Sequence, residues 1–146
     1  MADLIIRRAE EKDVLAIEQI EKQCFSVPWS YESLHKDIVE NNLAFYVAAE
    51  IDGHVCGYVG VWKIFDEGHI TNVAVAPEYR RMHIGRAMLE TLIEVTGQAG
   101  IERYTLEVRA GNEPAIKLYE GLGFKPEGIR PGYYEDNGED ALIMWR

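Results

Sequence analysis

Residues 72–87 read NVAVAPEYRRMHIGRA, and they join a strand to a helix through a basic turn. Alternating apolar residues mark the strand, which ends at Pro77, and the helix is expected from about Gly85 to Gly97. The first turn of a helix presents unpaired N–H groups and a positive dipole end, and a glycine there lets a phosphate approach the backbone. The turn is a candidate phosphate site, and a basic loop that only caps an ordinary helix explains it equally well. Neither a Walker A sequence nor a G-x-G-x-x-G pattern occurs, which argues against nucleoside triphosphate and dinucleotide ligands.

Strand and helix patterns alternate on both sides of this stretch, as they do in a mixed α/β domain. The Asp52-Gly53 pair between two strand patterns predicts an antiparallel hairpin. Asp13 and Ser30 are expected to begin the first two helices, and Gly123 is expected to end the last one. The predicted strands are 4–8, 43–50, 55–65, 69–75, 104–108, 124–130 and 141–145, and the predicted helices are 13–24, one from 30, 85–97 and one from 114. This order indicates helices that cover a mixed sheet.

The length of 146 residues suits one domain, residues 1–146, with 47% hydrophobic and 27% charged residues. No apolar run approaches the roughly 20 residues that span a bilayer, and the N-terminus carries no secretion signal. We therefore expect a cytoplasmic protein with no membrane partner. Cys24 and Cys56 form neither a C-x-x-C nor a zinc spacing, so we expect two buried thiols and no disulfide.

The formal net charge of −10 argues against nucleic acid as the main partner, because phosphate binding needs clustered Lys and Arg. A basic partner fits this charge better, although an acidic surface also serves solubility alone. The four histidines show no metal-ligand spacing, and we therefore expect no metal site. They are His35, His54, His69 and His83.

A second stretch, residues 106–124, reads LEVRAGNEPAIKLYEGLGF and again joins a strand to a helix. Within the strand, Thr105, Glu107 and Arg109 share one face, so Glu107 needs a polar setting. Taken singly, each polar residue is better explained by structure: Glu107 as a solvated carboxylate, Asn112 as a helix N-cap, and Tyr119 as a core aromatic.

Together the two stretches resemble the cofactor and catalytic motifs of the GNAT superfamily of N-acetyltransferases. The string L-E-V-R-x-x-N, A-x-x-L-Y and G-F resembles in particular the ribosomal-protein-alanine N-acetyltransferases. The resemblance covers nearly the whole chain, including residues 28–30, 132–134 and 139–141. It implies the GNAT fold, an α+β domain in which four helices flank a central mixed, mostly antiparallel sheet of about seven strands.

The resemblance also implies that acetyl-coenzyme A (acetyl-CoA) is the co-substrate. The backbone of the basic turn would hold its pyrophosphate, the preceding strand would pair with its pantetheine arm, and Asn112 would lie near its thioester. The implied cofactor-binding residues are Val73, Ala74, Val75, Arg81, Met82, His83, Ile84, Gly85, Arg86 and Asn112. The family pattern Q/R-x-x-G-x-G/A has a histidine here, His83, at its first glycine. Because histidine enters the left-handed region more readily than most residues, we expect the site to survive.

For catalysis, the resemblance implies Glu107 as the general base and Tyr119 as the general acid. A free α-amine has a pKa of roughly 7.7 to 8.0, so part of it is neutral near pH 7, whereas a lysine at about 10.4 needs more help from a base. In the family, the central strands splay near Val75 and Glu107, which would open a slot for the cofactor.

The substrate peptide is expected to enter this slot between two loops that carry aromatic side chains. Trp29 belongs to one loop, with Tyr31 just after it in the next predicted helix, and Tyr133 and Tyr134 belong to the other loop. Ordinary surface packing explains these aromatic residues about as well.

The favoured function is acetylation of the α-amine of a protein, an N-terminal alanine of a small-subunit ribosomal protein. A second hypothesis is an acetyltransferase for lysine or for a small polyamine or antibiotic amine, which the acidic surface would also attract. A third hypothesis is a non-catalytic acyl-CoA sensor, in which Glu107 and Tyr119 would be dispensable. Their joint presence at the family spacing disfavours the sensor. The oligomeric state stays open.

Overall fold

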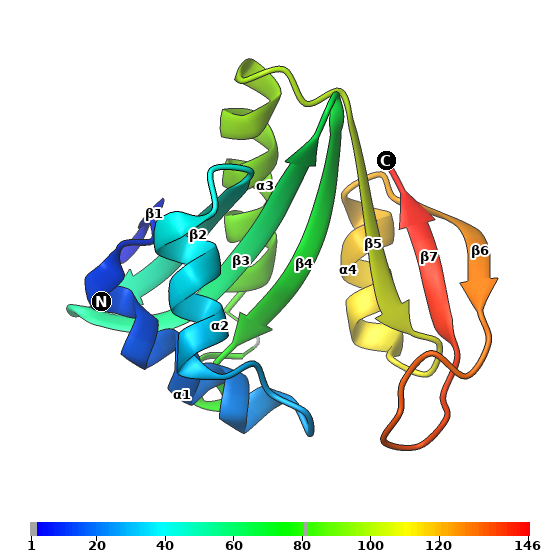
Figure 1. Ribbon diagram of the computed structural model, residues 1–146, viewed down its shortest axis with the longest axis horizontal. Coiled ribbons are helices and arrows are strands. Elements are labelled where there is room, and N and C mark those ends of the chain that lie inside the picture. Colours follow the sequence, from blue (N-terminus) through cyan, green and yellow to red (C-terminus); the bar gives the residue numbers. More distant parts are fainter. Residues whose placement is uncertain (1–2, 81) are drawn as a thin grey trace.

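The computed structural model describes residues 3–80 and 82–146, which form one seven-stranded sheet with helices on both faces (Figure 1). The strand order is β1-β2-β3-β4-β5-β7-β6, and every neighbouring pair is antiparallel except β4 and β5. The strands are β1 (Leu4–Arg8), β2 (Ala44–Ile51), β3 (His54–Ile64), β4 (Glu67–Val75), β5 (Arg103–Arg109), β6 (Lys125–Arg130) and β7 (Ala141–Trp145). The helices are α1 (Val14–Cys24), α2 (Tyr31–His35), α3 (Ile84–Gln98) and α4 (Glu113–Gly121). The predicted fold class and order of elements are confirmed.

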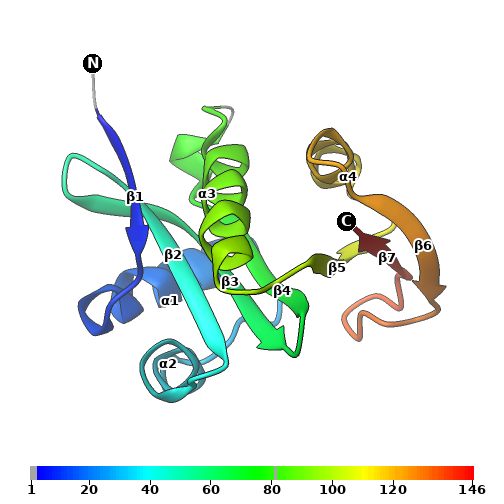
Figure 2. The same ribbon diagram turned by 90° about the horizontal axis from the view of Figure 1, so that it is seen from above.

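The sheet separates two hydrophobic cores, as the view from above shows (Figure 2). On one face, α3 and α4 pack against the sheet through residues such as Leu92 and Tyr119. On the other face, α1 and α2 pack through Ile17 and Leu34, which meet Tyr58 of β3. The sheet face that looks toward α1 and α2 is called the front face below.

Several local predictions are confirmed. Asp52 and Gly53 have φ angles of 53° and 80°, as a tight hairpin between β2 and β3 requires. The Ser30 side chain accepts a hydrogen bond from the Ser33 N–H at 3.1 Å and caps α2. Gly123 follows α4 with a φ of 92°.

Asp13 stands at the N-cap position of α1 as predicted, but its side chain makes no capping hydrogen bond to that helix. The helical segment begins earlier, with a 3₁₀ turn at Glu11–Asp13, and the Asp13 carboxylate accepts a hydrogen bond from the Glu10 N–H at 2.8 Å. The same carboxylate accepts two hydrogen bonds from Arg7 of β1, at 2.7 and 2.8 Å. Asp13 therefore ties the first strand to the first helix.

The cysteines are both free, and they differ in burial. Cys56 is buried as predicted, whereas Cys24 is only half-buried, because it lies at the end of α1 and its thiol donates to the Val75 carbonyl at 3.4 Å. Among the helices that the structure describes, none is long and apolar enough to cross a membrane.

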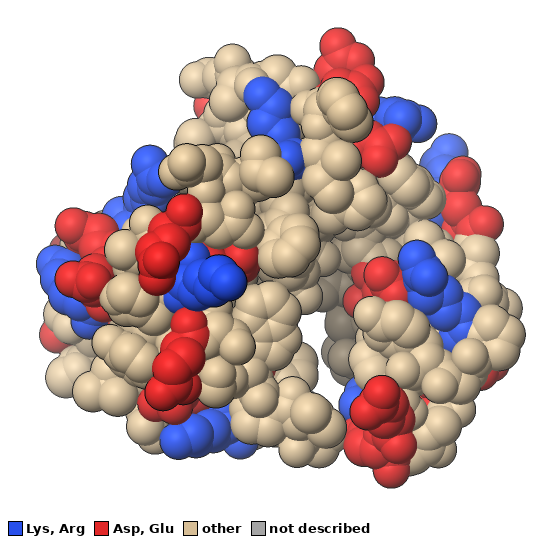
Figure 3. All heavy atoms as spheres, in the orientation of Figure 1, with Lys and Arg blue, Asp and Glu red and all other residues tan. Residues whose placement is uncertain are grey.

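The two central strands, β4 and β5, are paired over their first residues and then separate. β4 pairs with β5 only at Glu67–His69, opposite 103–105. Farther along, β4 keeps β3 as its neighbour and β5 keeps β7, so β4 and β5 diverge (Figure 1). Thr71 bulges out of the pairing, because Gly60 pairs with Asn72 while Val61 pairs with Ile70. Figure 3 shows a hollow between the two halves of the molecule, which is called the slot below.

Candidate active site

The turn before α3 has the backbone shape that the sequence predicts. His83 is the residue before the helix, and its φ of 58° and ψ of 24° are left-handed. The His83 side chain does not cap the helix, and no other described side chain accepts a hydrogen bond from its first N–H groups, which are therefore available to an anion. A Cβ added at Gly85 would lie 3.5 Å from Leu118 and 3.9 Å from Val75, which are ordinary contact distances. Packing therefore does not demand a glycine here, and the bare backbone fits a ligand that approaches between β4 and α4.

The edge of β4 beside the slot runs through Val73, Ala74 and Val75. Ala74 is buried on the front face, whereas the two valines pack toward α3 and α4. On its β5 side this segment has no strand partner among the described residues, so an extended ligand can pair with it. The Val75 carbonyl also accepts a hydrogen bond from Arg80 at 3.3 Å, which fixes the basic turn against the strand.

The other predicted cofactor residues have mixed surroundings. Met82 is half-exposed at the turn, and Arg86 forms an ion pair with Glu90 at 2.8 Å. Asn112 is the N-cap of α4, where its side chain accepts from the Ala115 N–H at 3.3 Å. Arg81 lies outside the described residues.

Glu107 lies on β5, and its carboxylate forms an ion pair with Arg130 of β6 at 2.9 Å. The side chain is 30% exposed. Two tyrosines of the loop between β6 and β7 surround it. Burial, followed by the charge of Glu107, raises the pKa of Tyr133. Burial raises the pKa of Tyr134 to about 12, against the opposing charge of Arg109.

Tyr119 lies on α4, on the face of the sheet opposite Glu107. Its ring meets Phe124 edge-on, with centroids 6.0 Å apart. The side chain is buried, and burial raises the pKa of its hydroxyl, with a smaller contribution from Tyr134. Tyr119 and Glu107 therefore belong to the same half of the molecule, on opposite faces of the sheet.

The two loops that the sequence places at the peptide entrance do meet. Ser26, in the loop after α1, donates a hydrogen bond to Asp136 of the β6–β7 loop at 2.6 Å. Arg109 holds the second loop through contacts with Asp136 and Glu139 at 2.8 and 3.4 Å, and its guanidinium lies 4.0 Å from the centre of the Tyr134 ring.

Trp29, at the end of the first loop, and Tyr31, at the start of α2, differ in setting. Trp29 packs against the front-face core, and its backbone N–H donates to the Glu21 carboxylate at 2.7 Å. Tyr31 stacks on His35 with ring centroids 5.9 Å apart and is partly exposed. Trp29 is therefore fixed more firmly than Tyr31.

Sequence reasoning missed a buried carboxylate beside the slot. Glu21 is 1% exposed, and besides Trp29 it accepts from the Tyr58 hydroxyl and from the Asn72 amide, the latter at 2.9 Å. The Oδ1 atom of Asn72 has no hydrogen-bond partner among the described residues. Glu21 lies four residues after Ile17 and three before Cys24, on the apolar stripe of the first helix. A carboxylate on that stripe was a signal of a buried polar network, although the pattern does not say which residues donate to it. Within residues 3–80 and 82–146, no three His, Cys, Asp or Glu side chains gather as metal ligands.

Comparison with known proteins gives a consistent result. A family model described as "Acetyltransferase (GNAT) family" matches residues 14–124. The ribosomal protein bS18-alanine N-acetyltransferase of Escherichia coli (strain K12) is 38% identical over 141 residues, which cover 95% of this chain and 94% of that protein. A relative from Bacillus subtilis (strain 168) is 41% identical over 140 residues, covering 96% of this chain and 93% of its own length. The crystal structure of the ribosomal-protein-S18-alanine N-acetyltransferase from Escherichia coli superimposes with a TM-score of 0.90 at 34% identity, covering 98% of this chain and 92% of that one.

Proposed function

Because this chain belongs to the acetyltransferase (GNAT) family and is an acetyl-CoA-dependent N-acetyltransferase, we propose that it acetylates the α-amine of a protein that begins with alanine. The observation that carries this proposal is the full-length similarity to the Escherichia coli enzyme, whose name gives the alanine of ribosomal protein bS18 as its target. A bS18 protein is accordingly the proposed partner. The net charge of −10 supports a basic protein substrate.

The proposed cofactor site lies at the start of α3 and along β4. Acetyl-CoA supplies a thioester carbon as the electrophile. We assign its pyrophosphate to the uncapped N–H groups that begin at Ile84, next to the left-handed His83 and the bare backbone of Gly85. The edge of β4 at residues 73–75 would pair with the pantetheine arm.

Glu107 is the proposed general base. It lies on the front side of the slot, where Arg130 holds its carboxylate and the Tyr133–Tyr134 loop covers it. Attack on the thioester needs a neutral amine, and an α-amine with a pKa of roughly 7.7 to 8.0 is partly neutral already at pH 7. A half-exposed carboxylate is therefore a sufficient base for this substrate class, directly or through one water.

Tyr119 is the proposed general acid. Burial raises its pKa, which keeps its proton in place at neutral pH, as an acid requires. An ordinary tyrosine, with a pKa of about 10, is already a weaker acid than the coenzyme A thiol, for which a cysteine pKa of about 8.5 is the nearest guide, and the raised pKa of Tyr119 widens this difference. Proton transfer from Tyr119 then depends on direct contact between its hydroxyl and the departing sulfur.

The test is to incubate the purified protein with acetyl-CoA and three acceptors, and to map the label by mass spectrometry. The acceptors are a lysine-free peptide with a free N-terminal alanine, the same peptide with a blocked N-terminus and an internal lysine, and spermidine. We expect the label on the alanine α-amine alone. Faster labelling of the blocked peptide or of spermidine would make this a lysine or small-amine enzyme, and no labelling would favour an acyl-CoA sensor.

A further inference from the structure

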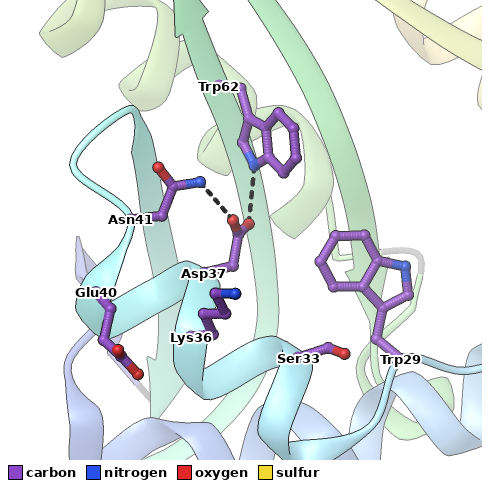
Figure 4. Close-up of a pocket in the computed structure, with 7 residues that line it drawn as sticks. All are labelled: Trp29, Ser33, Lys36, Asp37, Glu40, Asn41 and Trp62. Atoms are coloured by element: carbon purple, nitrogen blue, oxygen red, sulfur yellow. Dashed lines mark hydrogen bonds between the residues drawn. The ribbon is translucent and has the colours of Figure 1, made fainter.

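A cavity of about 530 Å³ opens on the front face beside the peptide entrance (Figure 4). It lies between α2, the π-helical turn at Lys36–Glu40 that continues α2, and β3. The lining residues that matter for its chemistry are Trp29, Lys36, Asp37, Glu40, Asn41 and Trp62. Trp29 belongs both to this cavity, called the indole pocket below, and to the loop at the entrance of the slot.

The floor of the indole pocket is a buried carboxylate without a cationic partner. Asp37 is 5% exposed. Its carboxylate accepts from the Asn41 amide at 2.8 Å, from the Trp62 indole N–H at 2.9 Å and from the Tyr46 hydroxyl. All three donors are neutral, and burial together with Asp37 raises the pKa of Tyr46, so that this hydroxyl keeps its proton. No described Lys, Arg or His forms an ion pair with Asp37.

This carboxylate has room for one more donor. An ionised carboxylate accepts about four hydrogen bonds. Tyr46 and Trp62 both donate to Oδ2, whereas Asn41 is the one described residue that donates to Oδ1. A buried negative charge that is satisfied by neutral donors alone gains from a cation more than an exposed one does, because the local dielectric constant is low.

The walls of the pocket suit a flat cation. Figure 4 shows the indoles of Trp29 and Trp62 on two sides of the space in front of Asp37. The hydrogen bond to Asp37 fixes the Trp62 ring, and the backbone bond to Glu21 fixes the position of Trp29. Tryptophan is the aromatic side chain that binds a cation most strongly on its face, and a guanidinium also stacks there.

The rim of the pocket carries one charge of each sign. Glu40 and Lys36 are both exposed, and Glu40 lies 3.7 Å from the imidazole of His35. Lys36 lies beyond ion-pair distance of Asp37, so it does not neutralise the Asp37 carboxylate. Its positive charge at the rim still repels an incoming cation. Removing the charge of Lys36 and removing that of Glu40 should therefore change cation binding in this pocket in opposite directions.

We propose that the indole pocket binds the guanidinium of an arginine that lies a few residues after the acetylated terminus of the substrate. This inference rests on the proposed function, because the peptide has to pass Trp29 on its way into the slot. The guanidinium stacks between the indoles and donates to Oδ1 of Asp37. The pocket therefore selects basic N-terminal segments, whereas the slot itself selects the α-amine.

The test measures binding without catalysis. Peptides that begin with an already acetylated alanine carry a single arginine, or its neutral isostere citrulline, at successive positions from the second to the sixth, and each is titrated calorimetrically into the full-length protein. At one position or two neighbouring positions we expect arginine to bind about tenfold more tightly than citrulline, the scale of a partly desolvated cation–π contact. Equal affinity at all five positions would overturn the proposal.

Charge variants at the rim locate the effect. Lys36→Gln should increase the preference for arginine severalfold, and Glu40→Gln should reduce it. Glu94→Gln, which makes the same charge change on the exposed face of α3, is the matched control and should leave the preference unchanged. If Glu40→Gln and Glu94→Gln change the preference for arginine equally, the preference comes from the overall charge of the protein and the indole pocket does not bind the guanidinium. Asp37→Asn should abolish the preference for arginine, provided that a thermal melt shows a folded variant. If this variant does not fold, the Lys36→Gln and Glu40→Gln results test the proposal.

The acceptor assay of the proposed function separates the two claims. If the lysine-free alanine peptide is acetylated equally well with arginine or citrulline, the indole pocket has no such role and the proposed function stands. If arginine tightens binding while no α-amine is acetylated, the pocket stands and the proposed function is wrong.

Discussion

The Tyr119 side chain combines a packing ring with a proposed catalytic hydroxyl, and Tyr119→Phe separates them. The ring contacts Phe124 and the core under α4, so phenylalanine should keep the packing and change the melting temperature little. If the hydroxyl protonates the departing thiolate, single-turnover acetyl transfer should slow by about 10²- to 10⁴-fold, the range of general acid catalysis. A well-folded variant that transfers acetyl at the wild-type rate would exclude the acid role.

His83 offers a second test at the scale of a single residue. Its φ of 58° is unfavourable for an L side chain, and glycine adopts this region freely. His83→Gly should bind acetyl-CoA as tightly as the wild type or more tightly, since backbone N–H groups do the binding. His83→Ala, which removes the imidazole but keeps the strained backbone, is the control. A large loss of affinity in both variants, measured by calorimetry, would show that the imidazole grips the phosphates.

At the scale of elements, Asp13 joins β1 to α1 through Arg7. Burial acts to raise the pKa of Asp13, but the hydrogen bonds from Arg7 and from the Glu10 N–H outweigh burial and lower it. A lowered pKa means that this contribution to stability is complete above the unfolded value of about 3.9 and is lost as the pH falls through the folded value. Asp13→Asn should therefore cost about 1–3 kcal/mol at pH 7, the scale of hydrogen bonds to a charged group. In denaturant titrations the difference from the wild type should shrink below about pH 4; a difference independent of pH would contradict the assignment.

The two entrance loops give another prediction at this scale. The hydrogen bond from Ser26 to Asp136 links the loop after α1 to the β6–β7 loop across the slot. Ser26→Ala should raise the KM for an alanine peptide severalfold, because the entrance is less ordered, while the Kd of acetyl-CoA stays the same. Steady-state kinetics and calorimetry test this directly. An unchanged peptide KM would mean that the link has no part in substrate binding.

At the scale of the whole molecule, the sequence predicts what local chemistry determines. The hairpin at Asp52-Gly53, the cap at Ser30 and the left-handed His83 each follow from the preferences of one or two residues, and the structure contains all three. The interactions that it could not predict join residues from separate elements. Arg130 reaches Glu107 from two strands away, and Asp37 becomes buried only because β2 and β3 supply donors beneath it. Strand alternation places Glu107 on a polar face, and helical spacing places Asp37 on the side of Leu34, but neither pattern says which element supplies the partner.

Because β4 and β5 separate, the proposed cofactor site and the proposed general base lie in different halves of the molecule. The α3 and β4 side would hold acetyl-CoA, whereas β5 and the β6–β7 loop would present Glu107 to the amine. A variant at Glu107 should therefore affect turnover and leave cofactor binding intact. Glu107→Gln is nearly isosteric and removes only the charge and an ion pair with the half-exposed Arg130, which is worth at most about 1 kcal/mol.

Turnover of Glu107→Gln with a free N-terminal alanine peptide, measured as a function of pH beside the Kd of acetyl-CoA, tests the account most directly. We predict an unchanged Kd and a turnover lower by about 10²- to 10⁴-fold near pH 7, with partial recovery at higher pH as more of the amine becomes neutral without help. Turnover like that of the wild type across the whole pH range would contradict it.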